Sequence, residues 1–131
     1  MTWKDSYAIG NAQIDQQHKM LVETLSKLLL CLQDCTGSNR DACKSTIDFL
    51  NSYGASHFAA EELLMESVGF SETARHKALH ADYKEEVHQL ELMLMRNDYD
   101  RDSAGKLAEF LTKWWIFHIV KEDKKLAAYC K

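Results

Sequence analysis

The sequence contains no proline, and only five of its 131 residues are glycine. Proline interrupts helix interiors and glycine weakens them, so their scarcity favours long helices over strands and tight turns. Residues that favour helices (Leu, Ala, Lys, Glu and Met) are plentiful. We therefore expect an all-α fold. The length suits one domain, because it allows a real core but leaves no room for a second domain beside a complete bundle.

The sequence also lacks long apolar runs and runs of basic residues. No segment approaches the ~20 apolar residues of a membrane span, and residues 1–6 lack the apolar stretch of a signal peptide. The formal net charge is −4 with both signs interspersed, so no basic patch is available for nucleic acid. We predict no membrane span and no nucleic-acid partner, and we interpret the protein as soluble and cytoplasmic.

Cysteine is present but not in a metal-binding pattern. The chain contains no CxxC, no c-type haem motif and no zinc-finger spacing. The four cysteines are Cys31, Cys35, Cys43 and Cys130. A reducing cytosol would keep them as thiols, and we interpret them as packing residues or incidental surface thiols.

Apolar residues recur at steps of three and four in four segments separated by short breaks, which predicts an up-down-up-down antiparallel four-helix bundle. The expected helices span residues of about 14–34, 41–67, 72–96 and 103–120. Residues 1–13 are expected to form an extended arm whose Trp3, Tyr7 and Ile9 lie against the bundle. Residues 122–131 are expected to form a short C-terminal helical segment.

Polar residues occupy positions in these apolar seams where leucine would be expected. They are His18, His57, Glu61, His76, His80 and His118. A lone histidine on an apolar stripe is more often a hydrogen-bonded core residue than a ligand. Five histidines and a carboxylate in one core are different, because every buried polar group needs a partner and a leucine-rich interior offers few. Metal ions would satisfy all of them together.

The spacing of two pairs suits metal binding. His57 and Glu61 are four residues apart, as are His76 and His80, so the members of each pair lie about 40° apart on one helix face. Each pair can therefore address the same ion. Imidazole and carboxylate ligands suit iron, whereas a structural zinc site would prefer cysteine and close at four ligands.

Asp123 is a further candidate ligand with an awkward spacing. His118 and Asp123 are five residues apart, which on an ideal helix places them about 140° apart, on different faces. If Asp123 is a ligand, the helix must unwind or bulge between Phe117 and Asp123. Such deformations are common at functional sites.

Several short motifs follow one another along the chain in a recognisable order. They are Ile9-Gly10, Ile14-Asp15-Gln16-Gln17-His18, His57-Phe58-Ala59-Ala60-Glu61-Glu62 with Met65, the His76-xxx-His80 pair, and Trp114 leading to His118-Ile119 and Asp123. With these motifs the sequence resembles the hemerythrin family across almost its whole length. All seven ligand positions of that family are filled here.

The resemblance implies a centre of two iron ions joined by an oxo or hydroxo bridge, ferrous in the deoxy form and ferric in the oxy and met forms. Its implied ligands are His76, His80 and His118 on one iron, His18 and His57 on the other, and Glu61 and Asp123 as bridges. The iron with two histidines keeps an open position for O2. The implied function is reversible O2 binding for storage, transport or delivery, without enzyme activity. Azide or similar small anions would bind the met form, and an oxygen-consuming enzyme is a possible transient partner.

The resemblance also implies an O2 pocket bordered by Leu21 and Phe58, together with a leucine that follows the tryptophan of the fourth helix. This sequence instead reads Trp114-Trp115. Trp115 lies about 60° round the helix from His118. Either its indole flanks the open iron and excludes water, or it points outward against the amino-terminal arm.

Other readings of the motifs remain open. A ferritin-like di-iron oxidase uses two ExxH motifs, but this chain has only Glu85-Glu86-Val87-His88. His88 lies about 100° from the seam residue Val87, so we expect it at the surface and not as a ligand. Glu62 points away from Glu61 and is expected to be solvated and not metal-bound. A sensor of O2, redox state or iron, and an enzyme acting on peroxide or nitric oxide, are the alternative functions.

Overall fold

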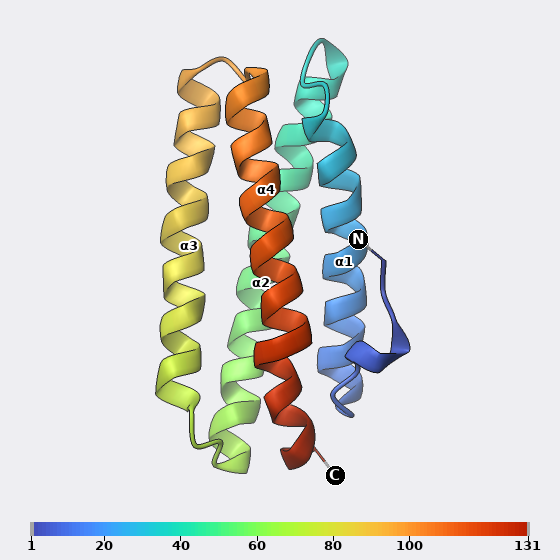
Figure 1. Ribbon diagram of the computed structural model, residues 1–131, viewed down its shortest axis with the longest axis vertical. Coiled ribbons are helices and arrows are strands. Elements are labelled where there is room, and N and C mark those ends of the chain that lie inside the picture. The colour runs from blue at the N-terminus through green and yellow to red at the C-terminus, as the bar shows by residue number, and fades with distance from the viewer. Residues whose placement is uncertain (1, 131) are drawn as a thin grey trace.

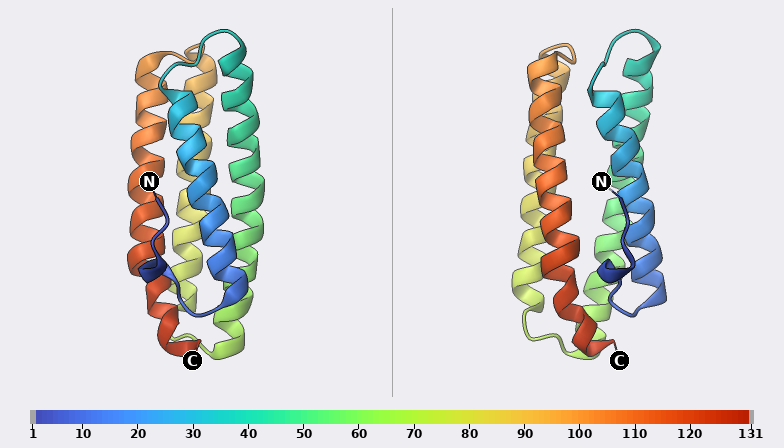
Figure 2. Two further views of the ribbon diagram at one scale, coloured as in Figure 1. Left: turned by 90° about the vertical axis from the view of Figure 1, so that its right-hand side faces the viewer. Right: turned by 45° about the vertical axis from the view of Figure 1, so that its right-hand side comes forward.

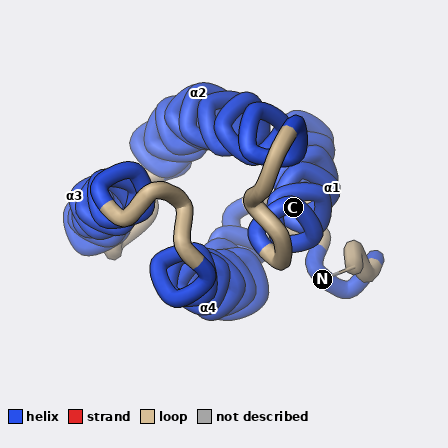
Figure 3. Tube along the Cα trace, turned by 90° about the horizontal axis from the view of Figure 1, so that it is seen from above, coloured by secondary structure: helices blue, strands red, loops and turns tan. Residues whose placement is uncertain are grey.

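The computed structural model describes residues 2–130, which fold into helices joined by short loops (Figure 1). The long helices are α1 (Ala12–Leu32), α2 (Ser38–Val68), α3 (Thr73–Arg96) and α4 (Arg101–Phe117). The short helices are η1 (Asp5–Tyr7), η2 (His118–Glu122) and η3 (Asp123–Tyr129). The loops alternate between the two ends of the bundle, so consecutive long helices run in opposite directions (Figures 1 and 3). The predicted all-α bundle is confirmed, and none of the described helices combines the length and apolarity of a membrane span.

Two helices begin earlier than the apolar pattern predicted. The side chain of Asn11 accepts a hydrogen bond from the backbone N–H of Ile14 (3.0 Å), and α1 begins directly after Asn11 instead of at residue 14. Asp100 accepts in the same way from the N–H of Ser103 (2.8 Å), and α4 begins at 101 instead of 103. Capping residues fix where the backbone becomes helical, whereas the apolar pattern marks only the first buried side chain.

The loop between α1 and α2 lies earlier in the chain than expected. α1 ends at Leu32 instead of 34, and α2 begins at Ser38 instead of 41. The backbone N–H groups of Gln33 and Asp34 bond to carbonyls three residues back, not four, so α1 tightens and stops.

The end of α2 and both ends of α3 agree with the expectation to within one residue. α2 ends at 68 instead of 67, and α3 spans 73–96 instead of 72–96. Gly69, with a φ of 68°, follows α2 in the left-handed conformation that glycine adopts without strain. The N–H of Phe70 then donates to the carbonyl of Met65 (3.0 Å), which closes the end of the helix.

The bundle interior contains two apolar clusters. The larger one includes Leu25, Leu28, Leu50 and Leu107. The smaller one consists of Ile9, Ile14, Met65, Phe70 and Leu126. The predicted polar seam residues are also buried, and they are enclosed by apolar side chains. These polar side chains are therefore shielded from solvent.

One of the two neighbouring tryptophans of α4 faces the core. Leu111 is followed in the core by Trp115, four residues later, whereas Trp114 is only partly buried. Steps of three and four both keep a residue on one helix face, so the apolar pattern alone did not decide between the two tryptophans.

The amino-terminal arm packs on the bundle but is not fully extended, because η1 forms a turn within it (Figure 2). Trp3 and Tyr7 meet edge to face, with ring centroids 5.6 Å apart, and Ile9 is buried. Lys124 of η3 donates to the backbone carbonyls of Ser6 and Ala8. These contacts fasten the arm beside the C-terminal helical segment.

Candidate metal centre

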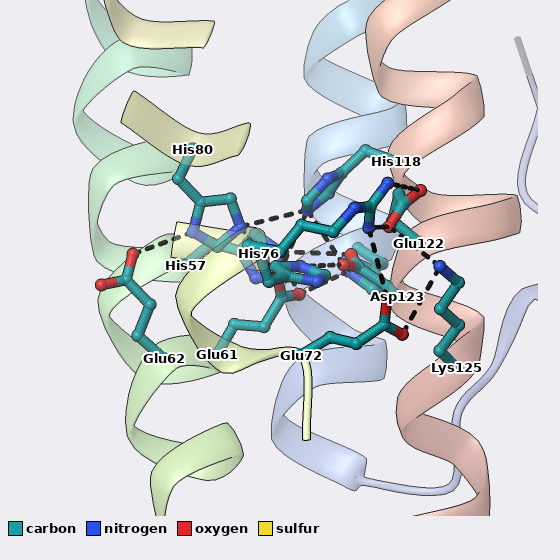
Figure 4. Close-up of polar contacts among 12 residues, drawn as sticks. His57, Glu61, Glu62, Glu72, His76, His80, His118, Glu122, Asp123 and Lys125 are labelled. Atoms are coloured by element: carbon teal, nitrogen blue, oxygen red, sulfur yellow. Dashed lines mark hydrogen bonds and ion pairs between the residues drawn. The ribbon is translucent and has the colours of Figure 1, made fainter. Parts of the chain in front are cut away.

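Seven polar side chains from α1, α2, α3 and the short helices η2 and η3 that follow α4 meet at one level of the interior (Figure 4). Each residue is at most 1% exposed. They are His18, His57, Glu61, His76, His80, His118 and Asp123. The structure therefore brings together every residue that the sequence predicted as a ligand, in two overlapping groups.

The first group consists of three histidines around one oxygen of Glu61. The Nε2 atoms of His76, His80 and His118 lie 2.8, 3.0 and 3.2 Å from Glu61 Oε1. The Nε2 atoms of His80 and His118 are 3.2 Å apart. Asp123 Oδ1 is 2.9 Å from Nε2 of both His76 and His118.

The second group contains two histidines and the other oxygens of the same carboxylates. Glu61 Oε2 lies 3.2 Å from Nε2 of His57 and 3.6 Å from Nε2 of His18. Asp123 Oδ2 lies 2.8 Å from Nε2 of His18 and 4.0 Å from that of His57. Glu61 and Asp123 thus each present one oxygen to the three-histidine group and one to the two-histidine group, as carboxylates that bridge two ions do.

A π-helical turn brings Asp123 onto the same face as His118. The segment His118–Glu122 is a π-helix, and the backbone N–H of Asp123 bonds to the carbonyl of His118, five residues back. The wider turn offsets the 140° separation that an α-helix would impose. The predicted deformation between Phe117 and Asp123 is confirmed, and α4 itself ends at Phe117 instead of 120 because the π-turn begins there.

Two of the histidines are oriented by partners on their other ring nitrogen. The Nδ1 atoms of His57 and His80 lie 2.9 Å from Gln17 Oε1 and 2.8 Å from Glu62 Oε2, respectively. An Nδ1–H that donates outward leaves Nε2 facing the centre, as in metal-binding histidines. Glu62 lies outside the two metal-binding groups, as expected, but it is only partly solvated, because its side chain is 29% exposed and contacts His80 on α3. Helix spacing predicts ligands, but it does not identify such outer partners.

An ion-pair network, also missed from the sequence, surrounds the π-turn. Arg75 on α3 donates to both oxygens of Glu122, at 2.6 and 3.1 Å. Lys125 lies 3.5 Å from Glu122 and 3.6 Å from Glu72 (Figure 4). Glu122 is nevertheless buried, with Arg75 and Lys125 as its cationic neighbours.

The carboxylates control the charge of the centre. Burial lowers the pKa of His18, but Asp123 and Glu61 more than offset this effect and raise that pKa to about 9. The same balance raises the pKa of His76 and His118 to about 9, whereas burial dominates for His57 and lowers its pKa. Clusters of this kind release protons when a metal ion binds.

The two carboxylates stay ionised inside the bundle. Burial would raise the pKa of Glu61, but the surrounding histidines hold it well below the usual range. Burial and the charge of Glu61 would raise the pKa of Asp123, but His118 and His18 lower it. Two negative charges are thus available to neutralise cations.

The donors fit metal ions better than they fit one another. Among the described residues, eight buried side-chain nitrogen or oxygen atoms lack a hydrogen-bond partner, and all but Trp3 Nε1 belong to this centre. Ligand atoms about 2.1 Å from one ion, at right angles, lie about 3.0 Å apart. The Glu61 and Asp123 contacts to the three-histidine group, at 2.8–3.2 Å, match that separation. Five imidazoles and two carboxylates form a donor set that suits iron.

An aromatic wall lies beside the centre. Phe58 stacks on His80, with centroids 4.0 Å apart, and on Trp115, at 5.6 Å. Trp115 is 1% exposed, and its indole N–H donates to the hydroxyl of Tyr83 (3.0 Å). The alternative in which Trp115 points outward against the arm is therefore wrong. Leu21 is buried in the same apolar cluster.

The remaining candidates lie outside the centre. His88 is exposed on α3, as expected. Among the described residues, the two metal-binding groups contain no cysteine. Cys35 and Cys43 are buried, whereas Cys31 and Cys130 are partly buried.

Comparison with known proteins agrees with this geometry. The family described as the hemerythrin HHE cation binding domain matches residues 10–130. A bacteriohemerythrin of Stenotrophomonas maltophilia is 33% identical over 131 residues, covering all of this chain and 82% of that protein. A bacteriohemerythrin of Pseudomonas aeruginosa is 31% identical over 94% of this chain and 76% of its own length. A bacteriohemerythrin of Clostridium acetobutylicum is 27% identical over 94% of this chain and 95% of its own length. The family implies a non-haem di-iron site. This chain belongs to the hemerythrin family.

Proposed function

We propose that this protein binds O2 reversibly at its di-iron centre and serves in oxygen storage, transport or delivery, not as an enzyme. The supporting observation is the unequal division of the histidines between two groups, both of which are contacted by Glu61 and by Asp123. In this proposal His76, His80 and His118 hold one iron, His18 and His57 hold the other, and Glu61 and Asp123 bridge them. When bound, the two irons supply the electrons that O2 takes up.

The unequal division of ligands leaves one position free. His76, His80 and His118, together with one oxygen each of Glu61 and Asp123, would hold one ion. His18 and His57, with the other oxygens of the same carboxylates, would hold the second ion with one histidine fewer, which would leave room there for a small molecule. A centre of this form can take up one small molecule without losing a protein ligand.

The residues beside the two-histidine group favour an uncharged ligand. The ring of Trp115 lies 6.4 Å from that of His57, and Phe58 lies 5.8 Å from it. These side chains are buried and apolar, so a hydrated anion would lose its water on entering whereas O2 has little hydration to lose. The wall would keep water from the open position and slow the conversion of the oxygenated form to the met form.

The same wall favours release of O2 over breakage of its O–O bond, which would need protons. The indole N–H of Trp115 is already donated to Tyr83. Burial raises the pKa of the Tyr83 hydroxyl, so this group does not give up its proton near neutral pH. These two groups of the wall therefore act as a barrier and not as general acids.

Iron and oxygen stoichiometry test the proposal. Metal analysis should give two irons per chain, and the anaerobically reduced protein should take up one O2 per two irons. Added reductant should then cause no sustained O2 consumption. One iron or stoichiometric zinc would contradict the di-iron centre, and continued O2 turnover with an electron donor would indicate an enzyme instead.

A further inference from the structure

Two buried cysteines touch at the end of the bundle away from the metal centre. The Sγ atoms of Cys35, in the loop after α1, and of Cys43, near the start of α2, lie 3.3 Å apart. Their exposures are 5% and 0%. Cys43 and His57 are 14 residues apart on α2, or about 21 Å along the helix axis. The pair is therefore separate from the residues that bind iron in the proposed function.

The surrounding structure holds the two thiols in contact. The thiol of Cys35 also lies 3.4 Å from the carbonyl oxygen of Cys31, and the side chain of Asn39 donates to the same carbonyl (3.1 Å). Cys35 and Cys43 both belong to the large apolar cluster, which fixes them from the other side. The loop between α1 and α2 is thus folded so that two sulfurs eight residues apart face each other.

We propose that Cys35 and Cys43 are a redox-active thiol pair that hydrogen peroxide converts into a disulfide. A disulfide bond is about 2.05 Å long, so the sulfurs need to approach by only about 1.2 Å. Cys35 lies outside the regular helices, and its loop can supply this movement. Cys31, which is partly buried four residues earlier, is a second thiol near Cys43, but the 3.3 Å contact joins Cys35 and Cys43.

The burial of Cys35 and Cys43 determines which oxidants can reach them. A bulky disulfide such as oxidised glutathione must reach a sulfur in line with its own S–S bond, and these sulfurs are almost completely covered. Hydrogen peroxide is small and uncharged, and of the two residues Cys35 is the more exposed, so peroxide is expected to react there first. Burial raises the pKa of Cys43, as do the neighbouring thiols, which suits Cys43 to the second step and not to the first attack.

The reaction balances without any further reagent. Cys35 attacks one peroxide oxygen, the O–O bond breaks, and a sulfenic acid and one water are formed. The sulfur of Cys43 then displaces the sulfenic oxygen, which leaves as a second water when the S–S bond forms. Two thiols thus lose two electrons and two protons to one peroxide. The product closes residues 35–43 into a covalent loop that ties the end of α1 to α2, which should raise the unfolding temperature.

Peptide mapping of the full-length, iron-loaded protein tests the proposal. The protein is treated with a small excess of hydrogen peroxide or, separately, of oxidised glutathione, and free thiols are then alkylated in denaturant. Trypsin places Cys31 and Cys35 in residues 28–40, and Cys43 in residues 41–44. Peroxide should join these two peptides with the loss of two hydrogen atoms, and dithiothreitol should separate them.

Variants identify the sulfurs. The cross-linked peptides should persist in Cys31→Ser and in the distant control Cys130→Ser, and should be absent from Cys35→Ser and Cys43→Ser. The parent protein gives the result even if a variant fails to fold. Full alkylation of Cys35 and Cys43 after peroxide, or their oxidation to sulfonic acids without a cross-link, would overturn the proposal. A glutathione adduct on Cys35 would contradict the claim that burial excludes large oxidants such as oxidised glutathione.

Discussion

Arg75 and Glu122 form a two-point ion pair that joins α3 to the π-helical turn. Arg75 precedes His76 in the chain, and Glu122 precedes Asp123, so the pair links the backbone beside two candidate ligands from different helices. The Glu122 side chain is 4% exposed whereas that of Arg75 is 49% exposed. Removing Arg75 would therefore strand a nearly buried carboxylate, with Lys125 as its remaining cationic neighbour.

Arg75→Ala should lower the free energy of unfolding by about 1–3 kcal/mol, the cost of leaving a buried polar group unsatisfied. It should also speed iron loss to a chelator, because the π-turn that positions Asp123 is released. Arg75→Lys keeps the charge but not the paired geometry, so its effects should be smaller. Chemical denaturation and the rate of chelator-induced bleaching measure the two effects.

A matched control is the pair between Arg40 and Asp98, whose 2.8 Å contact compares with 2.6 Å between Arg75 and Glu122. It lies at the other end of the bundle, and Asp98 is 86% exposed. Arg40→Ala should change stability by less than about 1 kcal/mol and should not change iron loss. Equal iron loss in the Arg75 and Arg40 variants would show that the first pair does not position the centre.

Replacing either bridging carboxylate should remove iron. Glu61→Ala or Asp123→Ala takes away one ligand of both ions, so iron content should fall below two per chain and thermal stability should fall with it. His88→Ala is the control, because His88 is exposed on α3 and should leave iron content unchanged. Two irons retained in either carboxylate variant, or iron lost from the His88 variant, would show that the ligand set is wrong.

Trp115 should control access to the open position. Trp115→Leu and Trp115→Ala should both speed autoxidation and azide binding, more in the alanine variant, with iron content unchanged. The alanine variant should also lose about 3–5 kcal/mol of stability because a large buried side chain is removed. Stopped-flow azide binding and the decay of the oxygenated spectrum measure the rates.

Tyr83→Phe tests whether Trp115 limits access by its bulk or through its hydrogen bond to Tyr83. This variant removes the partner of the Trp115 indole N–H but keeps the volume of the wall. It should lower stability by about 1–3 kcal/mol and leave both rates near those of the parent. Parental rates in both Trp115 variants would assign that side chain to packing alone.

Glu91 should make stability depend on pH. Burial raises its pKa, as does the charge of Asp48, although Asn51 donates a hydrogen bond to it (2.7 Å). Because the folded-state pKa lies above the unfolded value, ionisation of Glu91 costs stability at neutral pH, and this cost disappears as the pH falls through the folded pKa towards the unfolded value.

Glu91→Gln should therefore stabilise the protein by about 0.5 kcal/mol at pH 7, and the gain should shrink towards pH 4. The amide oxygen introduced by this substitution can still accept the hydrogen bond from Asn51. Denaturant midpoints measured at both pH values check this, and Glu86→Gln, at an exposed position of the same helix, controls for the change in net charge. A gain that is equal at both pH values would contradict the assignment to Glu91.

The sequence predicted the bundle and the convergence of its six polar seam residues, because helical spacing decides which side chains share a face. It also predicted the deformation near Asp123, since His118 and Asp123 cannot face one centre on an unbroken α-helix. Helix beginnings were less accurate, because caps such as Asn11 and Asp100 define them.

Contacts around the centre were missed because they depend on side-chain reach between helices. Gln17 and Glu62 meet their histidines across helix boundaries, and Arg75 reaches Glu122 only because the π-turn places that carboxylate toward α3. Spacing along one helix contains no information on these distances. The burial of Trp115 depends equally on how α4 is rotated in the bundle.

Reversibility is the central claim, and one optical measurement tests it directly. The iron-loaded protein is reduced without oxygen, exposed to O2, placed under vacuum, and exposed to O2 again. The account predicts a ligand-to-iron charge-transfer band that appears with O2, disappears under vacuum and returns with the same intensity over repeated cycles. A band that persists under vacuum, or an irreversible change to the met spectrum on first contact with O2, would contradict it.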